Sequence, residues 1–186
     1  MAPPRPPRVR DRQRGNTMLI ALVVLSALAT LASLTVVSVQ SSLKTSTNDR
    51  AQAIAMYAAE SGAAVAMDYL RSFLPASGVG AATPNIWSTL LSANLPGTPM
   101  PFPSNGAVPG DPANPFDPKL NASYSVVLLN NRDDALGDAT TNTDWRVIIH
   151  STGKGPQDSV AIVEWEIEGG FDRRPFILLG WHVVSL

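Results

Sequence analysis

Acidic and amide side chains gather between residues 130 and 144, and their chemistry suits a hard metal ion. Four aspartates of this stretch could bind a cation: Asp133, Asp134, Asp138 and Asp144. Ca²⁺ takes six to eight oxygen ligands from carboxylates, amides and carbonyls, so the stretch predicts a Ca²⁺ site. The spacing departs from that of an EF-hand loop, and no glutamate closes it. This incomplete ligand set favours the alternative, in which aspartate and asparagine act as turn residues at strand ends.

Residues able to support catalysis are few. The two histidines, His150 and His182, each fall in the middle of a predicted strand with no partner nearby in the sequence. The chain contains no Gly-x-Ser-x-Gly, no phosphate-binding loop and no His-Glu-x-x-His motif. We therefore expect no enzymatic activity and interpret both histidines as sheet residues. Among the four tryptophans, Trp87 lies in a predicted loop and is the one expected to face a partner.

Charge and cysteine content narrow the classes of partner and of stabilising device. The 186 residues carry a formal net charge of −1, but residues 1–15 hold five arginines and one aspartate. The remainder therefore has 9 basic and 14 acidic groups, a net charge of −5. Such a balance argues against nucleic acid as a partner, because phosphate binding needs clustered basic residues. Cysteine is absent, so neither disulfides nor thiolate metal sites are available.

The elements that must position these residues begin with a basic leader, which an uncharged run follows. Residues 1–15 combine prolines with arginines and predict a disordered cytoplasmic leader. Residues 18–39 contain no charge, proline or glycine over 22 positions, which is long enough to span a membrane. The basic flank predicts that the N-terminus stays in the cytoplasm. A cleaved signal peptide is the alternative, but its apolar region is shorter and ends in a small-residue cleavage site.

Helical character continues beyond the apolar run. We expect residues 16–43 to form a transmembrane and assembly half of one long helix, and residues 44–73 an amphipathic half. Residues 41–48 are the weakest part, because Ser, Thr and Asn compete for backbone groups. The apolar stripe predicted to pack on the rest of the domain consists of Ile54, Ala58, Ser61 or Gly62, Val65, Tyr69 and Phe73.

The remaining chain divides into a loop region and a sheet. Residues 74–122 hold ten of the sixteen prolines and predict a long loop laid over the domain, with one short helix over 86–95. Residues 123–186 predict an antiparallel sheet with strands over 123–130, 145–151, 159–168 and 176–185. The fold class expected is α+β, with a long N-terminal helix packed on a four-stranded antiparallel sheet.

The basic leader ending in glycine, the apolar helix and the C-terminal sheet together resemble a type IV prepilin. The junction is Arg14-Gly15, followed by Asn16 and an apolar run. The resemblance implies that a membrane prepilin peptidase cuts after Gly15 and that Asn16 becomes the mature, methylated N-terminus. Major pilins carry glutamate at the fifth mature position, where this chain has Ile20. In the family this glutamate is thought to pair with the N-terminal ammonium of a neighbouring subunit already in the filament. An apolar residue there suits a subunit at the filament tip, which has no subunit ahead of it.

Within that family the chain is most similar to PilX-type minor pilins. The glutamate-less start and the segment from Tyr57 to Gly62 carry this likeness, and Glu60 and Gly62 are implied as assembly residues. Gly62 would let another pilin helix approach closely, or it would only make room for a sheet side chain. The K-type pseudopilin of type II secretion is also similar, but it carries a large helical insertion for which this chain has no room.

The resemblance implies a non-enzymatic minor pilin of a tip complex that primes the pilus and presents a large adhesin. Its partners would be other minor pilins, the major pilin, the prepilin peptidase and the inner-membrane assembly machinery. The subunit would cross the bacterial inner membrane once, with its C-terminal domain in the periplasm, and would reach the cell surface at the pilus tip. The alternative from another class is an unrelated single-pass periplasmic binding module, for which residues 16–39 are only an anchor.

Overall fold

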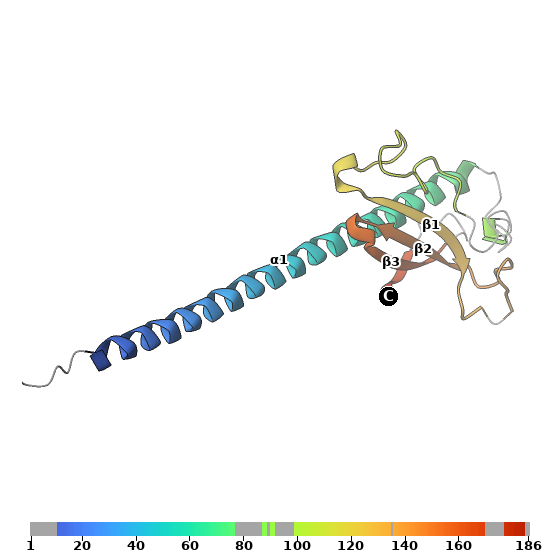
Figure 1. Ribbon diagram of the computed structural model, residues 1–186. Helices are drawn as coiled ribbons and strands as arrows, with labels where there is room; N and C mark the ends of the chain where they lie inside the picture. The colour runs from blue at the N-terminus through green and yellow to red at the C-terminus, as the bar shows by residue number, and fades with distance from the viewer. Residues whose placement is uncertain are drawn as a thin grey trace, which may run out of the picture. The chain divides into compact units, whose positions relative to one another are not determined.

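A computed structural model describes residues 11–76, 87, 88, 90, 91, 99–134, 136–169 and 177–184. One long helix, α1 (Asp11–Ala76), precedes four strands: β1 (Ser123–Asn130), β2 (Arg146–Lys154), β3 (Val160–Glu168) and β4 (Ile177–Val184). Two 3₁₀ turns, η1 (Pro118–Leu120) and η2 (Pro156–Asp158), lie before β1 and between β2 and β3. The expected α+β class, a long helix packed on a four-stranded antiparallel sheet, is confirmed (Figure 1).

The helix α1 continues through residues 41–48, the part predicted to be weakest. The hydroxyl of Thr45 donates to the carbonyl of Ser41 at 3.1 Å, and that of Thr47 donates to Leu43 at 2.8 Å. These side chains bond one turn back along the helix, so they do not withdraw its backbone groups. The chain divides between Thr47 and Asn48 into two compact units, and α1 contributes to both.

The four strands form an antiparallel meander in the order β1-β2-β3-β4. On β3, Ala161, Val163 and Ile167 are buried while the glutamates between them are partly exposed, so the sheet has one dry and one wet face. Strand β2 continues three residues beyond its predicted end at Ser151. The three added residues are Thr152, Gly153 and Lys154, and Gly153 is paired to Tyr124 of β1 and Ala161 of β3.

The buried face of α1 differs from the predicted stripe. Ala58 and Gly62 are buried as predicted, but Val65 is exposed and Ile54 and Tyr69 are only half-buried; Phe73 lies outside the residues whose side chains are described. The small and apolar residues that are buried on α1 are Ala51, Ala55, Ala58, Ala59, Gly62, Ala63, Ala66, Met67 and Leu70. Between residues 51 and 66 small side chains face the sheet because only they let the two backbones approach; the larger Met67 and Leu70 follow and join the core cluster.

Glycines of the sheet and helix show how close this approach is. A Cβ at Gly153 would collide with the carbonyl oxygen of Ala55 and the amide nitrogen of Ala59 on α1. A Cβ at Gly62 would lie 2.6 Å from the Oγ of Ser151 on β2. At Gly153 and at Gly62 the added Cβ would come closer to its neighbours than real Cβ atoms do. Packing rather than backbone torsion therefore requires glycine at each position.

Residues 99–122 cover the β1 side of the domain. Phe102 and Phe116 pack around Tyr124, with ring centroids 6.4 and 5.8 Å from that of the tyrosine. Tyr69 and Tyr57 of α1 complete this aromatic cluster, at 5.7 Å from Phe102 and 6.2 Å from Phe116 respectively. This part of the predicted loop therefore fills the space beside α1 and β1. Of the predicted short helix over 86–95, residues 87, 88, 90 and 91 are helical, and the others lie outside the described residues.

We expect the Gly153→Ala substitution to lower the free energy of unfolding by about 2–3 kcal/mol, because the added methyl meets the backbone of α1, which cannot rotate away. Denaturant unfolding of the full chain in detergent, followed by tryptophan fluorescence, measures the change. Gly180→Ala on β4 is the matched control, since the nearest heavy atom to its Cβ is 3.9 Å away. Equal losses in the two variants would contradict the close packing described here.

Candidate functional site

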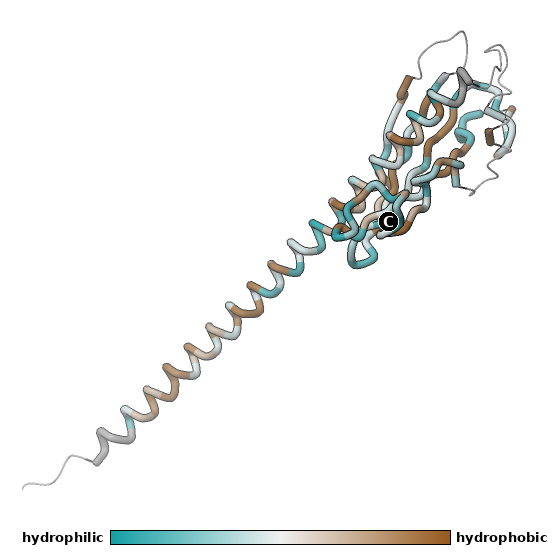
Figure 2. The backbone as a smooth tube through the Cα atoms, turned by 90° about the horizontal axis from the view of Figure 1, so that it is seen from above, coloured by the Kyte–Doolittle hydropathy of each residue, from teal (hydrophilic) through white to brown (hydrophobic). Residues whose placement is uncertain are grey.

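Two features could carry function: the apolar part of α1 and the acidic loop between β1 and β2. In the apolar part the large side chains from Met18 to Val39 are all exposed, and Figure 2 shows few hydrophilic residues along it. Among the described residues, α1 is the one helix long and apolar enough to cross a membrane. An apolar surface exposed on all sides of a helix is suited to lipid or to other helices rather than to water.

The residues predicted for processing and assembly lie in different environments. Gly15, Asn16 and Ile20 are all in α1, and the side chain of Ile20 is 60% exposed. Glu60 is exposed on the same helix. Gly62, by contrast, is buried against Ser151 and Tyr124 of the same chain. The space at Gly62 is thus taken by the sheet of the same chain, as in the second of the two interpretations.

Asp134 anchors the acidic loop by accepting hydrogen bonds from across it. Its carboxylate accepts from the amide nitrogen of Thr143 at 2.7 Å and from the hydroxyl of Thr143, and from the side-chain amide of Asn130 at 3.3 Å. Burial opposes ionisation of this carboxyl, but the hydrogen bonds from Thr143 and Asn130 outweigh it, and together they lower its pKa. A Cβ at Gly137 would collide with this carboxylate, so the loop needs glycine there.

The other predicted ligands act separately. Asp138 accepts from the amides of Thr140 and Thr141, both at 2.8 Å, and these bonds, first of all that from Thr140, lower its pKa. Asp144 accepts from the side chain of Asn131 at 2.6 Å and from the amide of Arg146 at 3.1 Å. Asp133 is exposed. Asp138 and Asp144 each cap a local turn, as the turn alternative expects, whereas Asp134 bonds across the loop to Thr143.

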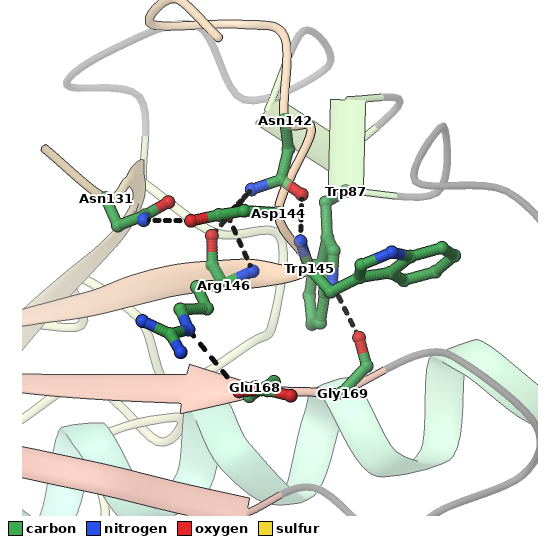
Figure 3. A network of polar contacts seen from close by, with 8 residues as sticks. All are labelled: Trp87, Asn131, Asn142, Asp144, Trp145, Arg146, Glu168 and Gly169. Carbon is green, nitrogen blue, oxygen red and sulfur yellow. Dashed lines mark hydrogen bonds and ion pairs between the residues drawn. The ribbon is translucent and has the colours of Figure 1, made fainter. Parts of the chain in front are cut away.

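Asn142 is the centre of the polar network that closes the loop (Figure 3). Its side-chain amide donates to the Oδ1 of Asn130 at 2.8 Å and to the carbonyl of Arg146 at 2.6 Å. Its side-chain oxygen accepts from the amide of Trp145 at 3.0 Å. Sequence reasoning missed this buried residue, because one asparagine among many acidic and amide neighbours has no distinguishing spacing.

The carboxylates do not converge on a common point. Within the described residues no group of three or more His, Cys, Asp or Glu side chains is placed to hold a metal ion. Three of the four predicted ligands already accept protein hydrogen bonds, so the geometry favours turn formation over Ca²⁺ binding. The Ca²⁺ site stays a prediction that needs its own measurement.

Trp87 differs from its predicted environment, whereas His150 lies in β2, as predicted. Trp87 is fully buried, and its indole Nε1–H donates to the carbonyl of Gly169 at 2.8 Å, so the expectation that it faces a partner is wrong. Trp87 belongs to the buried core cluster, together with Leu90 and Leu91. His150 has a partner on the next strand, with its Nδ1 2.9 Å from the Oε1 of Glu164.

Comparison with protein-family models, with curated proteins and with solved structures found no match to this chain.

The hydrogen bonds of Asp134 predict a pH-dependent stability. Because its pKa is lowered in the folded state, its contribution is present above the ordinary aspartate pKa of about 3.9 and is lost as the pH falls through the folded value. Asp134→Asn should therefore lower the free energy of unfolding by about 1–3 kcal/mol at pH 7, with a smaller difference at pH 3. Unfolding curves at both pH values test this, and Asp133→Asn, at an exposed position, should change neither.

The same contacts predict the response to Ca²⁺. If the loop is closed by its own hydrogen bonds, the melting temperature of the full chain in detergent should be the same with a chelator and with millimolar Ca²⁺. A ligand that binds only the folded state would raise it. A rise that Asp134→Asn or Asp138→Asn abolishes would instead establish the predicted Ca²⁺ site.

Proposed function

We propose that this protein is a minor pilin of the PilX type, a non-enzymatic subunit of a tip complex that initiates type IV pilus assembly. The observation that carries the proposal is the combination of an uncharged stretch of α1, directly after Arg14-Gly15, with a four-stranded antiparallel sheet packed on the later part of that helix. A plain anchor does not require the apolar run to continue as the helix that forms the domain core.

Ile20 supports a position at the tip. In this family the glutamate at that place is thought to pair with the N-terminal ammonium of a subunit already assembled. An unpaired charge is costly in hydrocarbon, so a subunit with no neighbour ahead of it has no use for the glutamate. Ile20 is exposed on α1 and apolar, which suits contact with lipid or with apolar helices.

The proposal includes a place in the cell. The N-terminus lies in the cytoplasm of a bacterium, residues 16–43 cross the inner membrane, and the domain from Asn48 onward is periplasmic until assembly brings it to the cell surface. The basic flank before Gly15 supports this orientation. Other minor pilins, the major pilin and a large tip adhesin are the partners.

Processing gives the direct test. Co-expression with a prepilin peptidase should shorten the protein by its first 15 residues and leave Asn16 at the N-terminus, as intact-mass spectrometry of the purified chain measures. Cells that lack the peptidase should yield the full mass. Gly15→Val should block the shortening, while Gln13→Ala, two residues away, should leave it unchanged.

Full mass in the presence of an active peptidase would contradict the minor-pilin assignment. It would favour the single-pass binding module instead. That module also predicts that any other spanning sequence can replace residues 16–39 without loss of function, whereas an assembly helix does not tolerate such a replacement.

A further inference from the structure

The two histidines of the chain lie on either side of one glutamate. In the register of the sheet, Glu164 of β3 is directly opposite His150 of β2 and also directly opposite His182 of β4. Directly opposite residues of antiparallel strands point to the same face of the sheet. The three side chains therefore form one row across β2, β3 and β4, which we call the His-Glu-His row.

The row lies on the wet face of the sheet, where its polar groups are accessible. The side chains of His150 and Glu164 are 24% and 22% exposed, and His182 is exposed. Glu166 is the next residue of β3 on this face, and its carboxylate makes no hydrogen bond or ion pair with any described residue. Two imidazoles and two carboxylates thus share one patch, in which only His150 and Glu164 bond to each other among the described residues.

We propose that the His-Glu-His row binds one Zn²⁺ ion, with Glu166 as the fourth ligand. Two imidazoles and a carboxylate are an established ligand set for Zn²⁺. Imidazole nitrogen also distinguishes this patch from a Ca²⁺ site, because Ca²⁺ takes oxygen ligands. The charge agrees, since the carboxylates of Glu164 and Glu166 neutralise the two positive charges of the ion.

The spacing of the strands suits this arrangement. Neighbouring strands lie about 4.8 Å apart, so the backbones of β2 and β4 are about 10 Å apart on either side of β3. An imidazole bound through Nε2 reaches roughly 6 Å from its Cβ to the metal, of which about 2 Å is the Zn–N bond. This reach exceeds half of the separation, so the rings of His150 and His182 can lean over Glu164 and bind one ion above it.

The side chains must turn before they converge. In the structure described, the Nδ1 of His150 lies 2.9 Å from the Oε1 of Glu164, and the Nε2 of His182 lies over Gly180, 3.9 Å from the place that a Cβ would take there. Among the described residues, no three ligands are therefore already placed to hold a metal. The turn of His182 meets no side chain at Gly180, and exposed side chains change rotamer readily.

A metal bound from three strands would tie β4 to the rest of the sheet. At the β1 edge, the amide of Met100 donates to the carbonyl of Val126 at 2.9 Å, and the side chain of Asn105 bonds to the backbone of Val126 at 2.8 and 2.7 Å. At the opposite edge, β3 is the only described segment with backbone hydrogen bonds to β4. Every large apolar side chain of β4 is exposed, between 37% and 59%.

The last strand is thus the least supported part of the described sheet. The chain has no cysteine, so no disulfide can hold this strand in place. Zn²⁺ bound by the His-Glu-His row supplies a link from β4 across β3 to β2. The inference is independent of the proposed pilus function, because it involves neither the leader nor the apolar part of α1.

Zinc titration tests the site. Calorimetry of the full chain in detergent, without a histidine tag, should show one Zn²⁺ per chain with micromolar affinity. His150→Ala and His182→Ala should each weaken binding by about tenfold or more, because loss of even a residue behind a ligand has that effect. Glu168→Gln is the matched control on the same strand and face. Glu168 is ion-paired with Arg146 at 3.3 Å and lies outside the row, so this variant should bind as the wild type does.

Thermal unfolding gives a second readout. Zn²⁺ at about one hundred times its dissociation constant should raise the melting temperature by about 5–10 °C, since it binds only the folded sheet. His182→Ala should melt as the wild type does without Zn²⁺, because the side chain is exposed, and should show no rise with it. This variant keeps the test decisive if His150→Ala, which loses its bond to Glu164, is less stable.

Three results would overturn the proposal. The first is a wild-type chain that binds no Zn²⁺ up to millimolar concentration. The second is wild-type affinity in either histidine variant, since the ion would then be held without one of the two imidazoles. The third is loss of binding in Asp138→Asn with both histidine variants unaffected, which would place the ion in the acidic loop.

Discussion

The close approach of α1 to β2 is the constraint on which the rest of the domain depends. Gly153 lies against the backbone of Ala55 and Ala59, and Gly62 lies against Ser151. A helix can come this near to a strand only if both contact surfaces are nearly free of side chains. That requirement explains why the buried face of α1 is mainly alanine, and why its larger residues are displaced to the flanks, where Tyr57 and Tyr69 meet the aromatic residues of 99–122.

Two segments beside the sheet satisfy polar groups near β1 and β2. Residues 99–122 close the β1 edge with backbone and Asn105 hydrogen bonds, while the acidic loop between β1 and β2 satisfies its own carboxylates through Thr143, Asn131 and its own backbone. At β4, no described segment other than β3 forms backbone hydrogen bonds with the strand. Many of the exposed apolar residues of the domain lie on this last strand, between Ile177 and Val184.

Several features followed from local pattern alone. A two-residue period bounded by turn residues predicted β1 with its observed bounds and β3 to within one residue, because such a period depends only on which side of the strand is wet. The exposed, uncharged stretch of α1 over residues 18–39 likewise follows from composition. The buried face of α1 was harder to predict. The predicted stripe ranked residues by hydrophobicity, whereas the residues buried between 51 and 66 are small. Trp87 was assigned to a partner because its loop context concealed that the chain returns to the core.

The sequence by itself determined the α+β class, the long helix and the two faces of the sheet, because each depends on periodicity and on the positions of proline and glycine. Tertiary structure decided which glycines are required by contact, which carboxylates are occupied by protein donors and which sheet edge is left open. These depend on segments far apart in the chain that meet only after folding, as Asn105 meets Val126 and Gly153 meets Ala55. No local pattern records such distances, so the acidic loop suggested a metal site by composition, while its geometry is that of a set of hydrogen-bonded turns.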